Sequence, residues 1–132
     1  MEQSQPTRVL IVEDEMMIAL DLEMQVETFG YSLTRHASSY DSAIAVAAET
    51  PPDIALIDGN LADGPTGARI AEKLSDLGVY CIAVSANPEL FDRCECIGIF
   101  LNKPFGTSEL RNALKVAEKA VAAGHQGGAG AG

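Results

Sequence analysis

Short apolar runs alternate along this chain with longer segments in which apolar residues recur every three or four positions. Short β-branched and aliphatic runs are typical of strands, and the helical period is typical of helices. Strands are predicted at 8–12, 32–37, 53–57, 80–84 and 98–101, and helices at 18–30, 41–49, 67–78 and 107–122. Because strands alternate with helices, the pattern predicts an α/β fold. We expect a (βα)5 doubly wound parallel five-stranded sheet of order 2-1-3-4-5.

Turn and cap residues set the predicted helix limits. Gly30 is placed to end the first helix, and Pro51 and Pro52 follow the second. Thr107 is a candidate N-cap for the last helix, with Glu109 in its first turn.

Length and composition predict one globular domain. The chain has 132 residues, of which 47% are hydrophobic, and two domains would each be too small to be stable. We expect an N-terminal arm at 1–7, a domain at 8–123 and a flexible Gly-rich tail at 124–132. No apolar run approaches the roughly 20 residues that span a bilayer, and the N-terminus does not read as a secretory signal. We therefore expect a cytoplasmic protein.

Net charge bears on which partners the protein can bind, and the cysteine content on disulfides and metal sites. Nine basic and nineteen acidic residues give a formal net charge of −10, which repels nucleic acid and anionic membranes. We therefore expect neither to bind directly. Cys81, Cys94 and Cys96 form an odd, sparse set for which we expect free thiols. Cys94 and Cys96 could form half a metal site, but no second ligand pair accompanies them.

Polar residues follow the predicted strands where a parallel α/β sheet binds ligands, at the carboxyl ends. They are Glu13, Asp14 and Glu15 after the first strand, Asp58 after the third, Ser85 after the fourth, and Asn102 and Lys103 after the fifth. Carboxylates held this close repel one another unless a cation lies among them, and hard oxygen ligands suit Mg²⁺. Asp58 stands where the strand connections reverse direction. A carboxylate placed there can attack a phosphoryl group while Mg²⁺, Ser85 and Lys103 stabilise the charge.

Four short motifs carry a family resemblance. VED follows the first strand, LID ends the third, VSA ends the fourth and KPF ends the fifth. With these motifs in this order, residues 8–122 resemble the receiver domain of two-component response regulators, which has a flavodoxin-like fold. The resemblance implies that Asp58 is the phosphoacceptor and that Glu13 and Asp14 are the acidic pair. Asp14 would bind Mg²⁺ directly and Glu13 through water.

The same resemblance assigns further roles. The backbone carbonyl of Asn60 would complete the protein's share of the metal shell. Ser85 would hydrogen-bond the phosphoryl group, and Lys103 would pair with it. Phe100 falls at the aromatic switch position, and Lys103–Pro104 at a peptide bond that is cis in relatives.

The resemblance implies a response regulator rather than an enzyme, although Mg²⁺-dependent self-phosphorylation and autodephosphorylation are expected. Because the predicted domain takes up nearly all of these 132 residues, we expect a single-domain regulator. Its phosphodonor would be a phosphohistidine on a sensor histidine kinase or a histidine phosphotransfer protein. Its output would be contact with an unknown downstream protein or onward phosphorelay.

Simpler interpretations exist for each residue taken singly. The acids after the first strand could cap a helix, Asp58 and Lys103 could be loop charges, and Phe100 could be ordinary core. Glu15, His36 and His125 are given no site role. A phosphatase of the haloacid-dehalogenase type also uses an Asp nucleophile, but such enzymes carry D-x-D after their first strand. An interaction module that needs no phosphate is a third possibility, against which the complete polar set argues.

The chain departs from the family between Ser85 and Lys103. It advances eighteen residues there, fewer than typical receivers do. Asn87 and Pro88 suit a helix start, but the later apolar residues show no sustained helical period. We expect at most a short helix at about 88–93 followed by irregular chain. In the family, partners and a symmetric dimer use the face made by the fourth helix, the fifth strand and the last helix. We expect this chain not to form that dimer.

Overall fold

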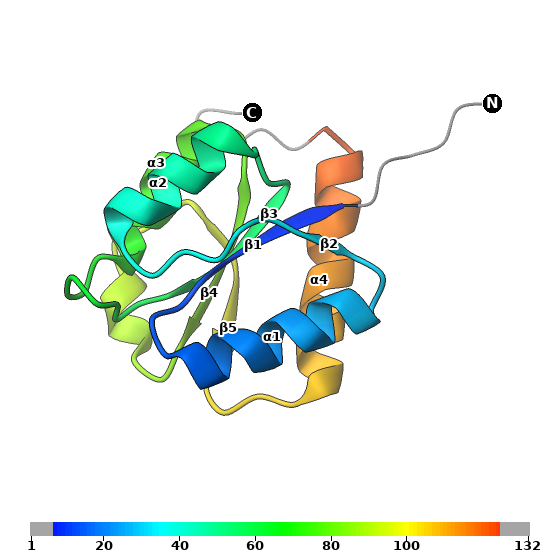
Figure 1. Ribbon diagram of the computed structural model, residues 1–132, viewed down its shortest axis with the longest axis horizontal. Helices are drawn as coiled ribbons and strands as arrows, with labels where there is room; N and C mark the ends of the chain where they lie inside the picture. The colour runs from blue at the N-terminus through cyan, green and yellow to red at the C-terminus, as the bar shows by residue number, and fades with distance from the viewer. Residues whose placement is uncertain (1–6, 125–132) are drawn as a thin grey trace.

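The computed structural model describes residues 7–124, and the expected arm at 1–7 and tail at 124–132 lie almost entirely outside them. The described residues form a five-stranded parallel sheet of order β2-β1-β3-β4-β5, which confirms the predicted α/β topology (Figure 1). The strands are β1 (Arg8–Val12), β2 (Ser32–Leu33), β3 (Ile54–Asp58), β4 (Tyr80–Ser85) and β5 (Ile97–Asn102). The helices are α1 (Met16–Thr28), α2 (Tyr40–Glu49), α3 (Gly67–Asp76), a 3₁₀ turn η1 (Pro88–Phe91) and α4 (Thr107–Ala122).

Alternate strand residues fill two separate cores, because successive side chains of a strand point to opposite faces of the sheet. On one face Leu10 and Ile57 pack with residues of α2 and α3. On the other face Val9 and Leu56 pack with residues of α1 and α4. Both faces are covered, and this accounts for the nearly uninterrupted apolar runs of β1, β3 and β4.

The helices follow the predicted apolar faces with small differences at their ends. Ile70, Ala71 and Leu74 are fully buried on α3, as predicted. The N-cap prediction for α4 was wrong. Gly106 is the N-cap residue, and its N–H donates to Oε1 of Glu109 at 2.8 Å.

The second strand is shorter than predicted. Only Ser32 and Leu33 form β2, and Ala37 rejoins the sheet through an isolated bridge to Val12. β2 is an edge strand that pairs with β1 alone, through Arg8 with Ser32 and Val9 with Leu33. None of the helices between residues 7 and 124 is both long and apolar enough to cross a membrane.

The connection from β4 to β5 is short, as predicted. It contains the single turn η1, after which the N–H of Cys94 donates to the carbonyl of Phe91 at 3.0 Å.

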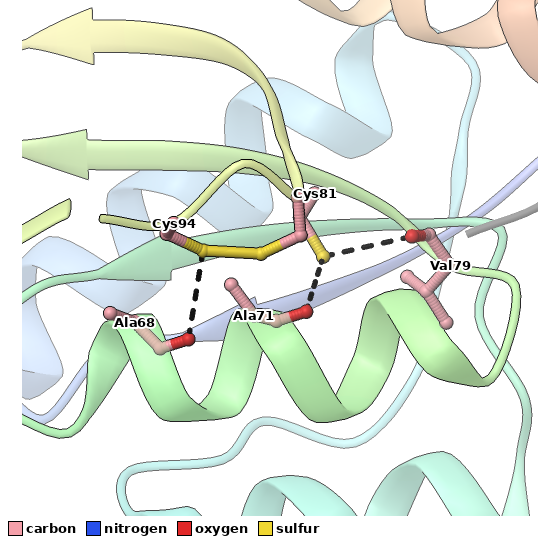
Figure 2. Close-up of a disulfide and its surroundings, with 6 residues drawn as sticks. Ala68, Ala71, Val79, Cys81 and Cys94 are labelled. Carbon is pink, nitrogen blue, oxygen red and sulfur yellow. Dashed lines mark hydrogen bonds between the residues drawn. A yellow bond between two sulfur atoms is a disulfide. The ribbon is translucent and has the colours of Figure 1, made fainter. Parts of the chain in front are cut away.

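The cysteine prediction was wrong for two of the three residues. Cys94 and Cys96 form a disulfide, whereas Cys81 is free and buried (Figure 2). The turn after η1 brings the Cα atoms of Cys94 and Cys96 to 5.3 Å, within the range that disulfides span. That turn could not be read from cysteine number and spacing alone.

Candidate functional site

Polar residues from four strands meet at the carboxyl edge of the sheet. Asp58 ends β3 and Ser85 ends β4, while Glu13 follows β1 and Lys103 follows β5. The register pairs Asp58 with Val84 and Ser85 with Asn102, so these strands end at one level. The sheet topology thus brings together residues that lie up to 90 positions apart in the chain.

Lys103 is the cation at the centre of this group. Its Nζ donates to Oδ2 of Asp58 at 3.1 Å and to Oε1 of Glu13 at 3.2 Å. The exposed fraction of the side chain is 2% for Glu13, 12% for Asp58 and 24% for Lys103. Burial lowers the pKa of Lys103, but hydrogen bonds and charge from Asp58 and Glu13 outweigh this effect, so its pKa lies above the ordinary value. Lys103 therefore carries its charge at neutral pH.

Glu13 is a buried carboxylate that the fold holds on several sides. Its Oε2 accepts from the N–H of Glu15 at 3.2 Å, and its backbone N–H donates to Ala37 at 2.9 Å. The Nε2 of His36 donates to the Glu13 carbonyl. Burial raises the pKa of Glu13, the charge of Asp58 raises it further, and the Glu15 hydrogen bond and Lys103 act in the opposite direction. The group therefore needs a nearby cation to remain ionised at low cost.

Asp58 is positioned by the loop that follows it. Its Oδ1 accepts from the N–H of Asn60 at 3.1 Å, which leaves Oδ2 for Lys103. The start of α3 lies directly against this backbone, since a Cβ on Gly67 would lie 2.3 Å from the carbonyl oxygen of Asp58 and 2.7 Å from Cα of Gly59. Only glycine permits that approach.

Ser85 is hydrogen-bonded to the segment that follows β4 and to the segment that follows β5. Its Oγ accepts from the N–H of Asn87 at 2.9 Å. The N–H of Lys103 donates to the Ser85 carbonyl at 3.0 Å, just before the cis peptide bond Lys103–Pro104. The resemblance had implied that cis bond.

A cavity of about 290 Å³ opens over these residues and is lined by Asp14, Asp58, Asn60, Ser85 and Lys103, among others. One carboxylate oxygen each from Glu13, Asp14 and Asp58 lies within 4.8 Å of the other two. Three acids face one ammonium group here, and oxygen donors at this spacing suit a hard divalent cation. The acidic cluster is therefore consistent with a metal site.

Phe100 lies beyond this cavity on β5. Its half-buried ring packs edge-to-face on Phe91 of η1, with ring centroids 6.0 Å apart and planes at 76°. Leu90 and Phe91 in turn lie against Gly59, where an added Cβ would come within 2.9 and 3.0 Å of them. A chain of contacts thus runs from the residue after Asp58 to Phe100.

Sequence reasoning missed three residues that hold the site. Glu15 lines the cavity and His36 fixes the Glu13 backbone, although neither was given a role. Gly67 was predicted only as part of a helix face, but its place after the Gly- and Pro-rich loop was a signal of close backbone approach. His125 lies outside the described residues.

The sequence and the fold both resemble those of known proteins. The family model for the response regulator receiver domain matches residues 9–115. The chain therefore belongs to the response regulator receiver domain family. A receiver domain is a phosphoacceptor signalling module rather than a catalytic enzyme, and membership implies a histidine kinase as phosphodonor.

Among curated relatives, the chain is 38% identical to the phyllosphere-induced regulator PhyR of Methylorubrum extorquens over 87 residues, 64% of this chain and 33% of that protein. It is 33% identical to the KDP operon transcriptional regulatory protein KdpE of Escherichia coli over 115 residues, 84% of this chain and 51% of that protein. The chain thus spans between about a third and a half of the length of these two relatives.

Solved receiver structures share the fold. The PhyR receiver domain of Erythrobacter litoralis matches with a TM-score of 0.79 and 31% identity, covering 86% of this chain and 91% of that one. A receiver domain protein from Methanospirillum hungatei matches with a TM-score of 0.79 over 90% of this chain and 98% of that one. At 23% identity, the second match supports the fold alone.

Proposed function

We propose that this chain is a single-domain response regulator that accepts a phosphoryl group on Asp58 from a phosphohistidine donor. The observation that carries the proposal is the convergence of Glu13, Asp14 and Asp58 with Lys103 at one sheet edge. The donor is a sensor histidine kinase or a histidine phosphotransfer protein. The domain at 8–123 then signals through protein contacts or passes the phosphoryl group onward.

The proposed cofactor is Mg²⁺. Asp14, Asp58 and the backbone carbonyl of Asn60 would hold it, with Glu13 contributing through water. When bound, the ion would neutralise negative charge on the transferring phosphoryl oxygens. The fit rests on three carboxylates whose oxygens approach within 4.8 Å while one ammonium group serves two of them.

In the transfer step, a carboxylate oxygen of Asp58 attacks phosphorus and the phosphorus–nitrogen bond of the phosphohistidine breaks. The electron pair of that bond returns to the imidazole ring. Lys103 already donates to Asp58 Oδ2 and shifts its ammonium hydrogen bond to a phosphoryl oxygen. The Ser85 hydroxyl donates to a second phosphoryl oxygen. Both groups stabilise charge without themselves being consumed.

The proposed conformational change begins with the loss of a hydrogen bond to Ser85. Its Oγ accepts from the N–H of Asn87, the residue before η1. Turning that hydroxyl toward a phosphoryl group weakens this hydrogen bond and loosens η1, whose Leu90 and Phe91 rest on Gly59. Phe91 contacts Phe100, so the aromatic ring moves with the segment. Phosphorylation thereby reorders residues 87–101 and changes the surface offered to a partner.

The decisive experiment is phosphorylation of the Asp58→Asn variant by acetyl phosphate in Mg²⁺, followed by intact mass. We expect wild type to gain one phosphoryl group and the variant to gain none. Asp63→Asn is the matched control, because Asp63 lies in the same loop and bonds Thr66 and Tyr40. It should label like wild type. Equal labelling of Asp58→Asn and wild type would overturn the assignment.

The metal assignment has its own test. Removing the exposed carboxylate in Asp14→Ala should weaken Mg²⁺ binding, measured by titration calorimetry on the unphosphorylated protein. Asp41→Ala, which removes an exposed acid from the first turn of α2, is the control. Identical Mg²⁺ affinity in wild type and Asp14→Ala would show that the metal is misplaced.

A further inference from the structure

The Cys94–Cys96 disulfide occupies the link between η1 and β5. Cys94 is 9% exposed, Cys96 is half-buried, and Glu95 between them is exposed. Cys94 therefore belongs to the buried core, and Cys96 packs against that core with part of its surface in solvent. A small molecule can reach this turn, whereas it could not reach a disulfide inside the core.

The same turn determines where β5 begins. The N–H of Cys94 donates to the carbonyl of Phe91, and its Sγ lies 3.8 Å from the carbonyl oxygen of Ala68 on α3. Ile97, the residue after Cys96, pairs with Cys81 of β4. A register shift follows at once, because Ile82 pairs with Ile99. A covalent ring at 94–96 thus restrains the chain between the end of η1 and the first pair of β5.

The third cysteine differs from this pair. Cys81 is 1% exposed, and its Sγ lies 3.5 Å from the carbonyl oxygen of Ala71 and 3.6 Å from that of Val79. Figure 2 marks both contacts with dashed lines. Burial raises the pKa of the Cys81 thiol to about 12. Since the thiolate is the reactive form, Cys81 is inert in the folded protein. Cys81, which pairs with Ile97 at the start of β5, therefore serves as an internal control thiol.

We propose that Cys94 and Cys96 are a reversible redox site, a dithiol that low-molecular-weight disulfides close to the bond seen here. The more exposed Cys96 thiolate attacks one sulfur of the small disulfide, forms a mixed disulfide and releases one small thiol. Cys94 then attacks the Cys96 sulfur and releases the second small thiol. Two protein thiols are oxidised, one small disulfide is reduced to two thiols, and the thiol protons pass to the leaving sulfurs.

Closing the ring orders the start of β5 and opening it frees that link. None of the three cysteine side chains is needed for the carboxylate chemistry at Asp58, so the redox site is independent of the proposed phosphoryl transfer. The ring does lie in the segment that the proposed switch would move. A closed ring therefore narrows the motion available between Phe91 and Phe100.

The test uses the full chain, fully reduced and then equilibrated in glutathione buffers of graded oxidation. Rapid alkylation and peptide mapping should show Cys94 linked to Cys96 as the buffer becomes oxidising, with Cys81 alkylated only after unfolding. Amide hydrogen exchange across 94–102 should be several-fold slower in the oxidised protein. Cys96→Ser should exchange like reduced wild type in both buffers. Cys81→Ala should retain the full difference.

Two results would overturn the proposal. One is a stable glutathione adduct on Cys96 with Cys94 still alkylatable, because the second exchange step would then not occur. The other is equal exchange across 94–102 in the reduced and oxidised wild type. Both measurements use the wild-type protein, so neither depends on a variant that fails to fold.

Discussion

Two connections flank the strand that ends at Ser85, and they are built differently. The connection from β3 to β4 contains α3, whose buried residues include Gly67, Ile70, Ala71 and Leu74. The connection from β4 to β5 contains only η1, and within residues 86–96 Phe91 and Cys94 are the buried side chains. The first connection is anchored by a continuous buried face of α3, and the second by two buried side chains. The contrast indicates that the side of the site next to Asp58 and α3 is held firmly, whereas the β4–β5 connection is the part able to move.

A matched pair of leucine truncations should show this contrast most strongly. Leu74 is fully buried on α3, whereas Leu90 on η1 is half-buried. Leu74→Ala should lower the free energy of unfolding by about 2–5 kcal/mol, and Leu90→Ala by less than about 2 kcal/mol, because less apolar surface is lost. Urea unfolding measures both. Equal losses would mean that η1 is as firmly packed as α3.

Two glycines test the same contrast at the loop after Asp58. An alanine Cβ at Gly67 meets backbone atoms at 2.3 and 2.7 Å, whereas at Gly59 it meets the side chains of Leu90 and Phe91. Gly67→Ala should cost about 1–3 kcal/mol, and Gly59→Ala less, since side chains on a mobile turn can shift. Thermal unfolding compares them. A larger loss for Gly59→Ala would contradict a mobile η1.

The ion pairs of Lys103 with Glu13 and Asp58 predict a free energy of unfolding that depends on pH. In Lys103→Met the buried Glu13 loses its counter-charge, so its pKa rises further above the ordinary value. A carboxyl group whose pKa is raised by folding destabilises the protein above that pKa, and the penalty fades as pH falls through it. The variant should lose on the order of 1 kcal/mol at neutral pH, because Lys103 is partly exposed and water screens the pair.

Urea unfolding across acidic to neutral pH checks this expectation. The gap between Lys103→Met and wild type should close on acidification, whereas Lys115→Met, an exposed change on α4, should show no such trend. A gap that stays constant with pH would show that Glu13 does not depend on Lys103.

The smallest expected effect is a labelling rate at Cys81, measured on the wild-type protein. Burial raises the pKa of the Cys81 thiol to about 12. In the folded, reduced protein, at a pH close to the ordinary thiol pKa, Cys81 should therefore resist iodoacetamide. Labelling should proceed only as fast as the protein unfolds, and mass spectrometry measures its rate. Fast labelling of native Cys81 would show that β4 opens locally without global unfolding.

The sequence predicted the fold because strands buried on both faces leave an unmistakable apolar pattern, as in residues 54–57 and 80–84. It also predicted which polar residues meet, since residues that follow parallel strands share one sheet edge. It did not predict the Cys94–Cys96 bond, the Gly106 cap or the His36 contact. Each depends on the path of a turn, and turn geometry is set by tertiary packing rather than by periodicity.

The central claim is that charge added at Asp58 reorders the β4–β5 connection while the β3–β4 connection stays fixed. Amide hydrogen exchange with and without beryllofluoride and Mg²⁺ tests it most directly, because this complex stands in for the phosphoryl group on a carboxylate. We predict a change in protection across residues 87–101, with little change in α3 between Gly67 and Asp76. Unchanged protection across 87–101 in protein shown to bind beryllofluoride would contradict the claim.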